Sequence, residues 1–236
     1  MAPWRLLAVA AAAGTIASGC APKAQFLKSP YAPPRSVAVL PFDNASNSLE
    51  APVLMQKLAA DALATGGYNV VPAAEVEAKL RELGISQGGQ VRSRKTEEMA
   101  AALGASALLY GEVRKFSYMT IGVYMKREVN VGLELIAADG SRLWKHAAGA
   151  VRQDIEVDAA KHGRSFVESL GSQLAMKWIE RILSHPLYPE MQRSIHDVFL
   201  TLPSARNPRK SVGSYISSGY SDALPLGNMM RLPLGR

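Results

Sequence analysis

Apolar and polar residues alternate strictly between Met119 and Leu135. The apolar side chains fall on one parity, interrupted only by Arg127, and polar side chains occupy the other. This period of two is typical of antiparallel strands that bury one face and leave the other in water. We expect a turn between two such strands at Lys126-Arg127. A second turn is expected at Ala138–Ser141, because Asp-Gly supplies the positive φ angles that hairpin turns need. Residues 142–152 would return as the last strand.

The residues before this meander predict a β-α-β unit. Ser36–Phe42 is continuously apolar, which favours a strand buried on both faces. A helix should begin near Ser48, tolerate Pro52 in its first turn and end at Gly66-Gly67. Residues 68–71 would form the next strand, joined to the first by a right-handed crossover that makes the two parallel.

Further helices and one more strand complete the expected fold. One helix follows Pro72 and ends at Gly84, a polar glycine-rich loop covers 86–95, and Thr96 caps another helix. Residues 105–110 predict a further strand, and residues 160–183 and 190–202 predict amphipathic helices. The fold class is therefore α/β with a mixed sheet. The domain should cover 36–202, and 203–236 should be an extended or disordered tail.

The start of the chain carries an export signal. Arg5 precedes an uncharged apolar run from Leu6 to Ile16, and small residues lead into Cys20, the single cysteine. Basic, apolar and small residues in this order indicate a secretory signal peptide over 1–19. The small residues immediately before Cys20 are similar to a bacterial lipoprotein signal. In that family the cysteine thiol receives diacylglycerol and the new amino group is acylated. An ordinary cleaved signal that happens to end near a cysteine is the alternative.

Residues 20–35 would then be a lipid-anchored linker, stiffened by prolines between 30 and 34. Ala21 after the cysteine is not Asp, which by resemblance to lipoprotein sorting favours the outer membrane, with the domain facing the periplasm or exposed at the surface. Acylation would consume the cysteine and leave no thiol for disulfide or redox chemistry.

Composition limits the partners. A hydrophobic share of 48% and a mean hydropathy of +0.00 are typical of a folded globule. The net charge is +7, but an exported chain rarely meets nucleic acid, so anionic envelope surfaces are the better candidates. The basic run 92–95 is followed at once by Glu97 and Glu98, and we interpret it as a solvated loop.

No catalytic or metal-binding pattern emerges. The four histidines (His146, His162, His185 and His196) form neither an i, i+4 pair nor a His-Glu pattern. The glycines of 84–89 lack the Lys-Ser/Thr of a phosphate-binding loop. Asp43 is the best-placed acid, at the end of the first strand, although capping its own turn explains it more simply. We therefore predict no enzyme activity, no cofactor and no metal.

Four stretches carry a resemblance to known proteins: Ser36-Val-Ala-Val-Leu-Pro-Phe-Asp-Asn44, Gly67-Tyr-Asn-Val-Val-Pro72, Leu103–Gly111 and Asp139–Trp144. Their order is similar to the amino-terminal domain of TolB, a module also found in the lipoproteins CsgG and LpoB. It most resembles a family of outer-membrane lipoproteins typified by a neisserial vaccine-candidate antigen. The resemblance implies an envelope module that binds proteins, with no catalytic residues to carry over.

Two functions remain open at this point. The first is a lipoprotein anchored through Cys20 that binds envelope or secretion proteins, accessory to a CsgG-type system, or pairs as a homodimer. The second is a CsgG-type oligomeric pore, built from the alternating residues 119–135. A pore would need strands of about nine to eleven residues with an uncharged lipid-facing band.

Overall fold

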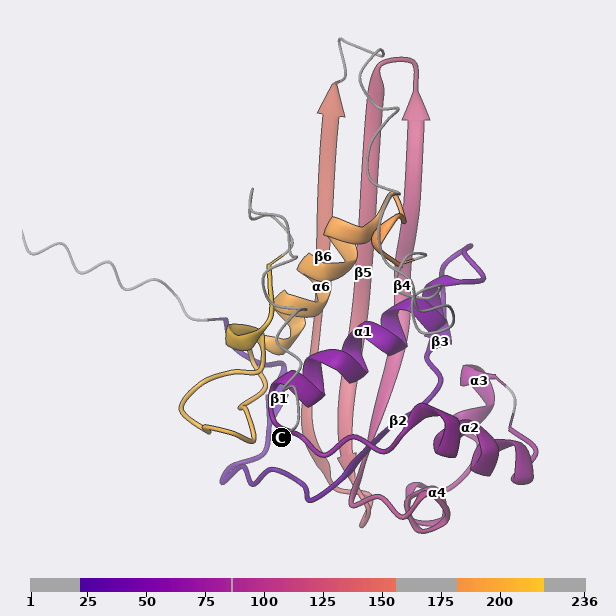
Figure 1. Ribbon diagram of the computed structural model, residues 1–236, viewed down its shortest axis with the longest axis vertical. Helices are drawn as coiled ribbons and strands as arrows, with labels where there is room; N and C mark the ends of the chain where they lie inside the picture. The colour runs from indigo at the N-terminus through magenta and orange to yellow at the C-terminus, as the bar shows by residue number, and fades with distance from the viewer. Residues whose placement is uncertain (1–21, 86, 156–181, 219–236) are drawn as a thin grey trace, which may run out of the picture.

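The computed structural model describes residues 22–85, 87–155 and 182–218. Its centre is a mixed sheet with the strand order β1-β6-β5-β4-β2, in which β3 also pairs with β4 (Figure 1). The strands are β1 Phe26–Leu27, β2 Val37–Val39, β3 Asp43–Asn44, β4 Ala107–Ile121, β5 Tyr124–Ala137 and β6 Arg142–Ile155. β2 and β3 run parallel to β4, and the other neighbours are antiparallel. The predicted α/β class with a mixed sheet is confirmed.

Helices cover both faces of the part of the sheet that contains β2 and the start of β4. Apolar side chains on these strands point alternately to the two faces and so enter two separate cores. Val37, Val39 and Leu109 face α1 (Ala51–Thr65) and α6 (Tyr188–Phe199). The intervening residues Ala38 and Leu108 face α2 (Ala73–Glu82) and α4 (Thr96–Leu103). Continuous hydrophobicity in these strands therefore reflects burial on both faces, as predicted.

The opening β-α-β unit is present but shorter than expected. Pairing of β2 stops before Pro41, which has no N–H to donate, and resumes with β4 at Asp43–Asn44. The expected strand 68–71 is reduced to one parallel bridge between Val37 and Val70. α1 begins at Ala51 with Pro52 in its first turn and ends before Gly66-Gly67.

The predicted turn at Lys126-Arg127 is wrong. β4 and β5 are joined at Gly122-Val123, where Gly122 adopts a φ of 58°. Because Ile121 pairs with Tyr124, the odd positions of β4 from Lys115 to Ile121 pair with even positions of β5. Met119 therefore shares a face with Lys126, and the apolar parity changes faces at the hairpin. The second turn is confirmed: β5 ends at Ala137 and β6 begins at Arg142, with positive φ at Gly140.

Two local expectations also need correction. The connector 86–95 contains a short helix, α3 (Gly88–Val91). A Cβ at Gly88 would lie 2.1 Å from the Phe42 carbonyl oxygen, so glycine permits this close approach. Thr96 is the first residue of α4 and makes no capping hydrogen bond; its hydroxyl instead contacts that of Tyr110.

Residues 203–218 differ from the expected extended tail. Leu202 and Val212 are joined by a backbone hydrogen bond, Pro203 bridges Ser211, and a 3-10 helix, η1, spans Gly213–Tyr215. Val212 is fully buried because it packs in the core beside α1. The predicted helix 190–202 is confirmed as α6. The predicted helix 160–183 lies outside the described residues except for its last two positions, and 219–236 lies outside them altogether.

Candidate interaction site

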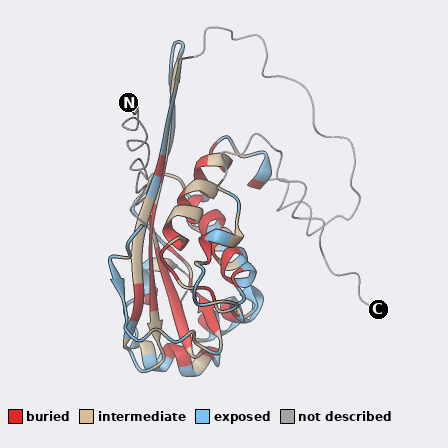
Figure 2. Ribbon diagram, turned by 90° about the vertical axis from the view of Figure 1, so that its left-hand side faces the viewer, coloured by how far each residue is buried: buried red, intermediate tan, exposed pale blue. Residues whose placement is uncertain are grey.

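Three strands of the sheet continue well beyond the helices as a projecting ribbon (Figures 1 and 2). We define the free ribbon by its paired positions: 115–121 of β4, 124–130 of β5 and 149–155 of β6. β3 accompanies β4 only as far as Val113, and β1 pairs with β6 only at Trp144 and Lys145. Within the described part of the chain, both outer edges of the free ribbon are therefore unpaired. Open edges are templates for another strand.

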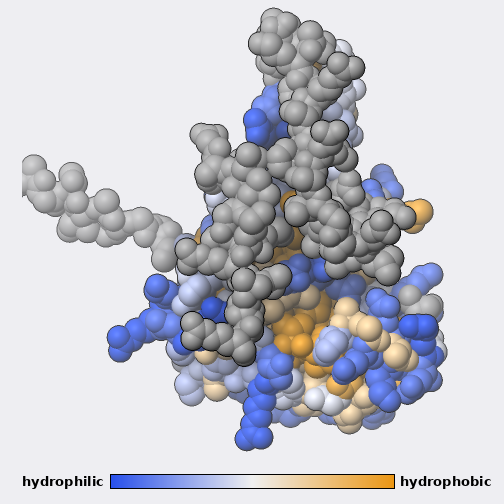
Figure 3. Space-filling model, viewed as in Figure 1, coloured by the Kyte–Doolittle hydropathy of each residue, from blue (hydrophilic) through white to orange (hydrophobic). Residues whose placement is uncertain are grey.

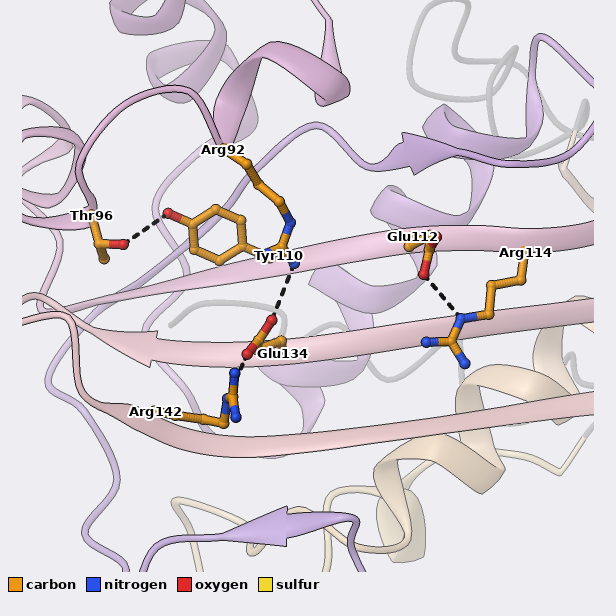
Figure 4. Close-up of polar contacts among 7 residues, drawn as sticks. All are labelled: Arg92, Thr96, Tyr110, Glu112, Arg114, Glu134 and Arg142. Carbon is orange, nitrogen blue, oxygen red and sulfur yellow. Dashed lines mark hydrogen bonds and ion pairs between the residues drawn. The ribbon is translucent and has the colours of Figure 1, made fainter.

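A β-bulge marks where the ribbon leaves the domain. The register of β4 and β5 shifts between Val113 and Lys115, leaving Arg114 as the extra residue. The Arg114 guanidinium binds Glu112 at 3.0 Å (Figure 4) and lies over Gly132, where a Cβ would approach it to 2.9 Å. Bulges increase strand twist and re-aim side chains. The ribbon therefore departs from the sheet at a fixed, side-chain-supported point.

The free ribbon exposes large apolar side chains. Ile121 and Val123 at its tip are 65% and 60% exposed, and further exposed apolar residues lie below them: Tyr118, Met119 and Val151. Figure 2 shows the change from buried residues at the base of the strands to exposed and intermediate residues near the tip. Scattered exposed apolar residues are ordinary on a protein, but a group on one projection with open edges indicates a binding surface.

Charged side chains keep both faces of the ribbon polar. On the face that α6 covers below, Asp154 pairs with Arg152 at 3.0 Å and with Arg127 at 3.7 Å. On the other face, Lys126 pairs with Glu128 at 2.9 Å. These exposed or half-exposed pairs contribute little stability each. Only the pair of Arg127 and Asp154 joins two strands, β5 and β6; the other two pairs lie within one strand.

α6 fastens the root of the ribbon. The Ser194 hydroxyl, fully buried, donates to the Val129 carbonyl oxygen at 2.9 Å and accepts from the Ala150 N–H at 3.2 Å. One turn earlier, the Glu190 carboxylate is 0% exposed, and neither of its oxygens has a hydrogen-bond partner in the described chain. Burial raises the pKa of Glu190, and the positive charges of Arg127 and Arg152 oppose that rise only in part. The amphipathic spacing of residues 190–202 predicted this helix but gave no sign of a buried acid.

A second polar cluster lies at the base of the sheet, on the face of α2 and α4 (Figure 4). Glu134 receives ion pairs from Arg92 and Arg142, and the Arg92 guanidinium lies 4.9 Å from the centre of the Tyr110 ring. Burial opposes ionisation of Glu134, but the two arginines outweigh it and lower its pKa. Because the carboxylate and both guanidinium groups are paired, the cluster is a structural tie between β4, β5, β6 and α3, not a reactive site.

The residues considered for chemistry are not brought together. Asp43 is exposed, and its carboxylate accepts the Asn44 N–H at 2.8 Å, the predicted turn-capping role. His185 pairs with Glu50 and His196 with Asp197, while His146 lies on β6. Cys20 and His162 lie outside the described residues. In the ranges that the structure describes, no group of three metal-ligating side chains and no helix able to span a membrane occur.

The described residues form an α/β domain with a projecting ribbon whose outer edges are unpaired among those residues. A family model described as GNA1162-like matches residues 25–182. The chain belongs to this GNA1162-like lipoprotein family. That membership confirms the predicted resemblance to a lipoprotein family typified by a neisserial antigen.

Several solved structures are similar at low identity. Lipoprotein GNA1162 from Neisseria meningitidis is 22% identical, with a TM-score of 0.49 over 64% of this chain and 100% of its own. A PelC dodecamer from Paraburkholderia phytofirmans is 24% identical, with a TM-score of 0.37 over 51% of this chain and 75% of its own. The LpoB C-terminal domain from Salmonella enterica is 15% identical, with a TM-score of 0.35 over 50% and 84%. No curated protein matches the chain.

Proposed function

We propose that this chain is an outer-membrane lipoprotein, acylated at Cys20, that binds other envelope proteins through the free ribbon without catalysing a reaction. The observation that carries the proposal is the pair of unpaired strand edges, within the described chain, beside exposed apolar side chains at the tip. An extended segment of a partner can add to such an edge, with backbone hydrogen bonds giving affinity and side chains giving selectivity.

Anchoring supports this role. The lipoprotein family and the small residues before Cys20 agree on attachment through acyl chains. Two or more chains give stable anchoring, at about 0.8 kcal/mol for each buried CH₂. An anchored binding module meets its partners within the envelope, where the exposed apolar side chains of the ribbon are accessible to them.

The pore alternative is less well supported by the ribbon. Strands that cross a bilayer need one face free of charge, facing lipid. Here Arg127, Arg152 and Asp154 occupy one face, while Lys126 and Glu128 occupy the other. Reproducible conductance across liposomes containing the acylated protein would reverse this preference.

Photo-crosslinking in intact cells tests the binding role. A benzophenone amino acid placed at Met119 or Val151 should capture a discrete partner, identified by mass spectrometry. Leu49 provides a control because it is 95% exposed and lies in the loop before α1, outside the strands of the free ribbon. Products seen equally from Leu49, or none from the ribbon positions, would count against the proposal.

The identity of the product distinguishes the forms that binding takes. Capture of the chain itself would establish a homodimer through the ribbon. Capture of a CsgG-type secretion protein would place the lipoprotein as an accessory of that system, the pathway we favour on the resemblance of its motifs.

A further inference from the structure

The segment that follows the proposed anchor (residues 22–35) and the C-terminal segment (residues 203–218) both contact Tyr68. The Tyr68 hydroxyl donates to the Pro203 carbonyl oxygen at 2.6 Å, and the Tyr31 hydroxyl lies 2.6 Å from it on the other side. Since the Tyr68 hydrogen is used toward Pro203, Tyr31 donates to Tyr68. Residues 22–35, the end of α1 and residues 203–218 therefore form one flank of the domain.

The C-terminal part of this flank is held in a defined place. The Ser204 hydroxyl and the Arg206 N–H both donate to the Gly66 carbonyl oxygen. The aliphatic stem of Arg206 packs against Gly67, where a Cβ would approach it to 2.2 Å, so the close fit requires glycine. Farther along, the Lys210 ammonium lies 5.9 Å from the centre of the Tyr215 ring.

This flank carries uncompensated positive charge. Residues 22–42 and 198–218 contain no Asp or Glu. We define the basic collar as five exposed cations of these segments, none in an ion pair within the described chain: Lys23, Arg35, Arg206, Arg209 and Lys210. Lys28 is left out because it lies near Asp139. Elsewhere, Arg92, Arg127 and Arg142 all face a carboxylate.

The flank that carries the collar begins close to the proposed anchor. Pro22, the first described residue, is two positions from Cys20, and two extended residues span at most about 7 Å. Figure 3 shows hydrophilic side chains projecting on the flank where the described chain begins. Attraction between exposed cations and an anionic membrane surface acts over about one Debye length, about 8 Å at physiological salt, so it takes effect when this flank touches the bilayer.

We propose that the basic collar binds anionic lipid headgroups of the membrane that holds the Cys20 acyl chains, and so presses this flank to the bilayer while the ribbon stays free for protein partners. This rests on the proposed anchoring. The occupant is a lipid surface because the short distance to the anchor brings the collar to headgroups before any soluble ligand. Exposed cations without neighbouring acids suit a fluid anionic surface, which needs no fixed geometry.

Vesicle binding of the full mature chain carrying Cys20→Ala tests the collar, since without acyl chains only the protein surface can bind. The chain should cosediment with phosphatidylglycerol-containing vesicles, far less with pure phosphatidylcholine vesicles, and weaken as salt rises. Arg206→Gln/Arg209→Gln/Lys210→Gln should bind about 100-fold more weakly, from roughly a fivefold loss per cation. Thermal unfolding followed by circular dichroism should match that of the parent chain.

The matched control is Arg81→Gln/Arg94→Gln/Lys95→Gln, which removes the same charge from exposed positions around α2 and α4. It should lose little affinity. If both triple variants lost the same affinity for the vesicles, net charge alone would explain binding and the proposal would be wrong. Equal binding to anionic and neutral vesicles would also contradict it. Binding to a second copy or to isolated peptidoglycan in place of vesicles would overturn it too. Failure of the anchor itself would appear separately, as a wild-type chain that does not fractionate with membranes.

Discussion

The hydroxyl of Ser194 donates a hydrogen bond to the Val129 carbonyl oxygen over 2.9 Å, at the point where the sheet leaves its helices. The Ser194 hydroxyl oxygen in turn accepts the Ala150 N–H, so one side chain of α6 fastens two adjacent strands. The ribbon is thus held from its root, and the stability of that root should depend on a single small polar group.

Replacing Ser194 with Ala removes both hydrogen bonds from a buried position. We expect unfolding to become easier by about 1–3 kcal/mol, the cost of leaving buried polar groups unpaired. Urea denaturation measures that loss, and hydrogen exchange at Ala150 should accelerate. Ser117→Ala, at an exposed serine of β4 within the same ribbon, is the control and should change neither. Unchanged exchange at Ala150 would show that α6 does not fasten the ribbon.

Glu190→Gln should stabilise the protein near neutral pH. The folded state raises the pKa of Glu190 through burial, so folding favours the protonated form. The contribution of Glu190 to the stability of the protein is therefore most favourable below the ordinary glutamate pKa of about 4.5. It is lost as pH rises through the raised pKa of the folded state. Glutamine should remove this fall and gain about 1–3 kcal/mol near pH 7. Urea denaturation of both proteins at pH 7 and at pH 4.5 measures this. If the variant were no more stable than wild type at pH 7, Glu190 would not be a destabilising buried acid.

Glu134→Gln should have the opposite effect. Burial alone would raise the pKa of Glu134, but the ion pairs with Arg142 and Arg92 lower it, so the folded state favours the ionised form. The stabilisation is present above the unfolded pKa of about 4.5 and is lost as pH falls through the lowered value. Near pH 7, where glutamine cannot form ion pairs with the arginines, we expect a loss of about 1.5–3 kcal/mol in urea denaturation. A variant as stable as wild type there would show that the arginines remain solvated.

Tyr68→Phe should loosen the junction of the two terminal segments. The change deletes the hydrogen bond to Pro203 and leaves the Tyr31 hydroxyl without its acceptor, in a place where burial raises the pKa of Tyr31 to about 12. Limited proteolysis should then cut residues 22–35 or 203–218 sooner than in wild type. Tyr215→Phe is a control because its hydroxyl makes no contact of this kind in the described chain. Cleavage at the wild-type rate would mean that packing alone holds these segments.

Cys20→Ala should release the protein from membranes while leaving its fold intact. Loss of the acyl chains removes the strongest membrane attachment, because each buried CH₂ contributes about 0.8 kcal/mol. Fractionation of cells, with circular dichroism of the released chain, measures both outcomes. A variant that stays wholly with membranes in high salt would reveal another anchor.

Local patterns were sufficient for most elements but not for their connections. Continuous apolar residues at 37–40 and 107–110 predicted strands buried on both faces, and Asp139-Gly140 fixed one hairpin. The other hairpin was misplaced because Gly122 is flanked by apolar residues, so the usual polar turn signal is absent. The ordered segment 203–218 was missed because its contacts with Gly66, Gly67 and Tyr68 are too distant in sequence to leave a periodic pattern.

The candidate site was only half visible in the same way. Alternation across 119–135 drew attention to the ribbon residues, but two facts needed the fold: where β3 and β1 stop pairing, and which residues rise above α6. The buried Glu190 had no local signal, since an acid in the first turn of a helix is ordinary.

The two-residue strand β1 limits how far the domain can stand from the proposed anchor at Cys20. While Phe26 and Leu27 stay paired with β6, the linker between Cys20 and Phe26 is six residues long (26 − 20) and reaches at most about 20 Å. If those pairs and the Tyr31–Tyr68 hydrogen bond break, the linker between Cys20 and Ser36 becomes sixteen residues long (36 − 20) and can reach about 55 Å. With the anchor at Cys20 that we propose, a few weak hydrogen bonds would set whether the ribbon works close to the bilayer or far out from it.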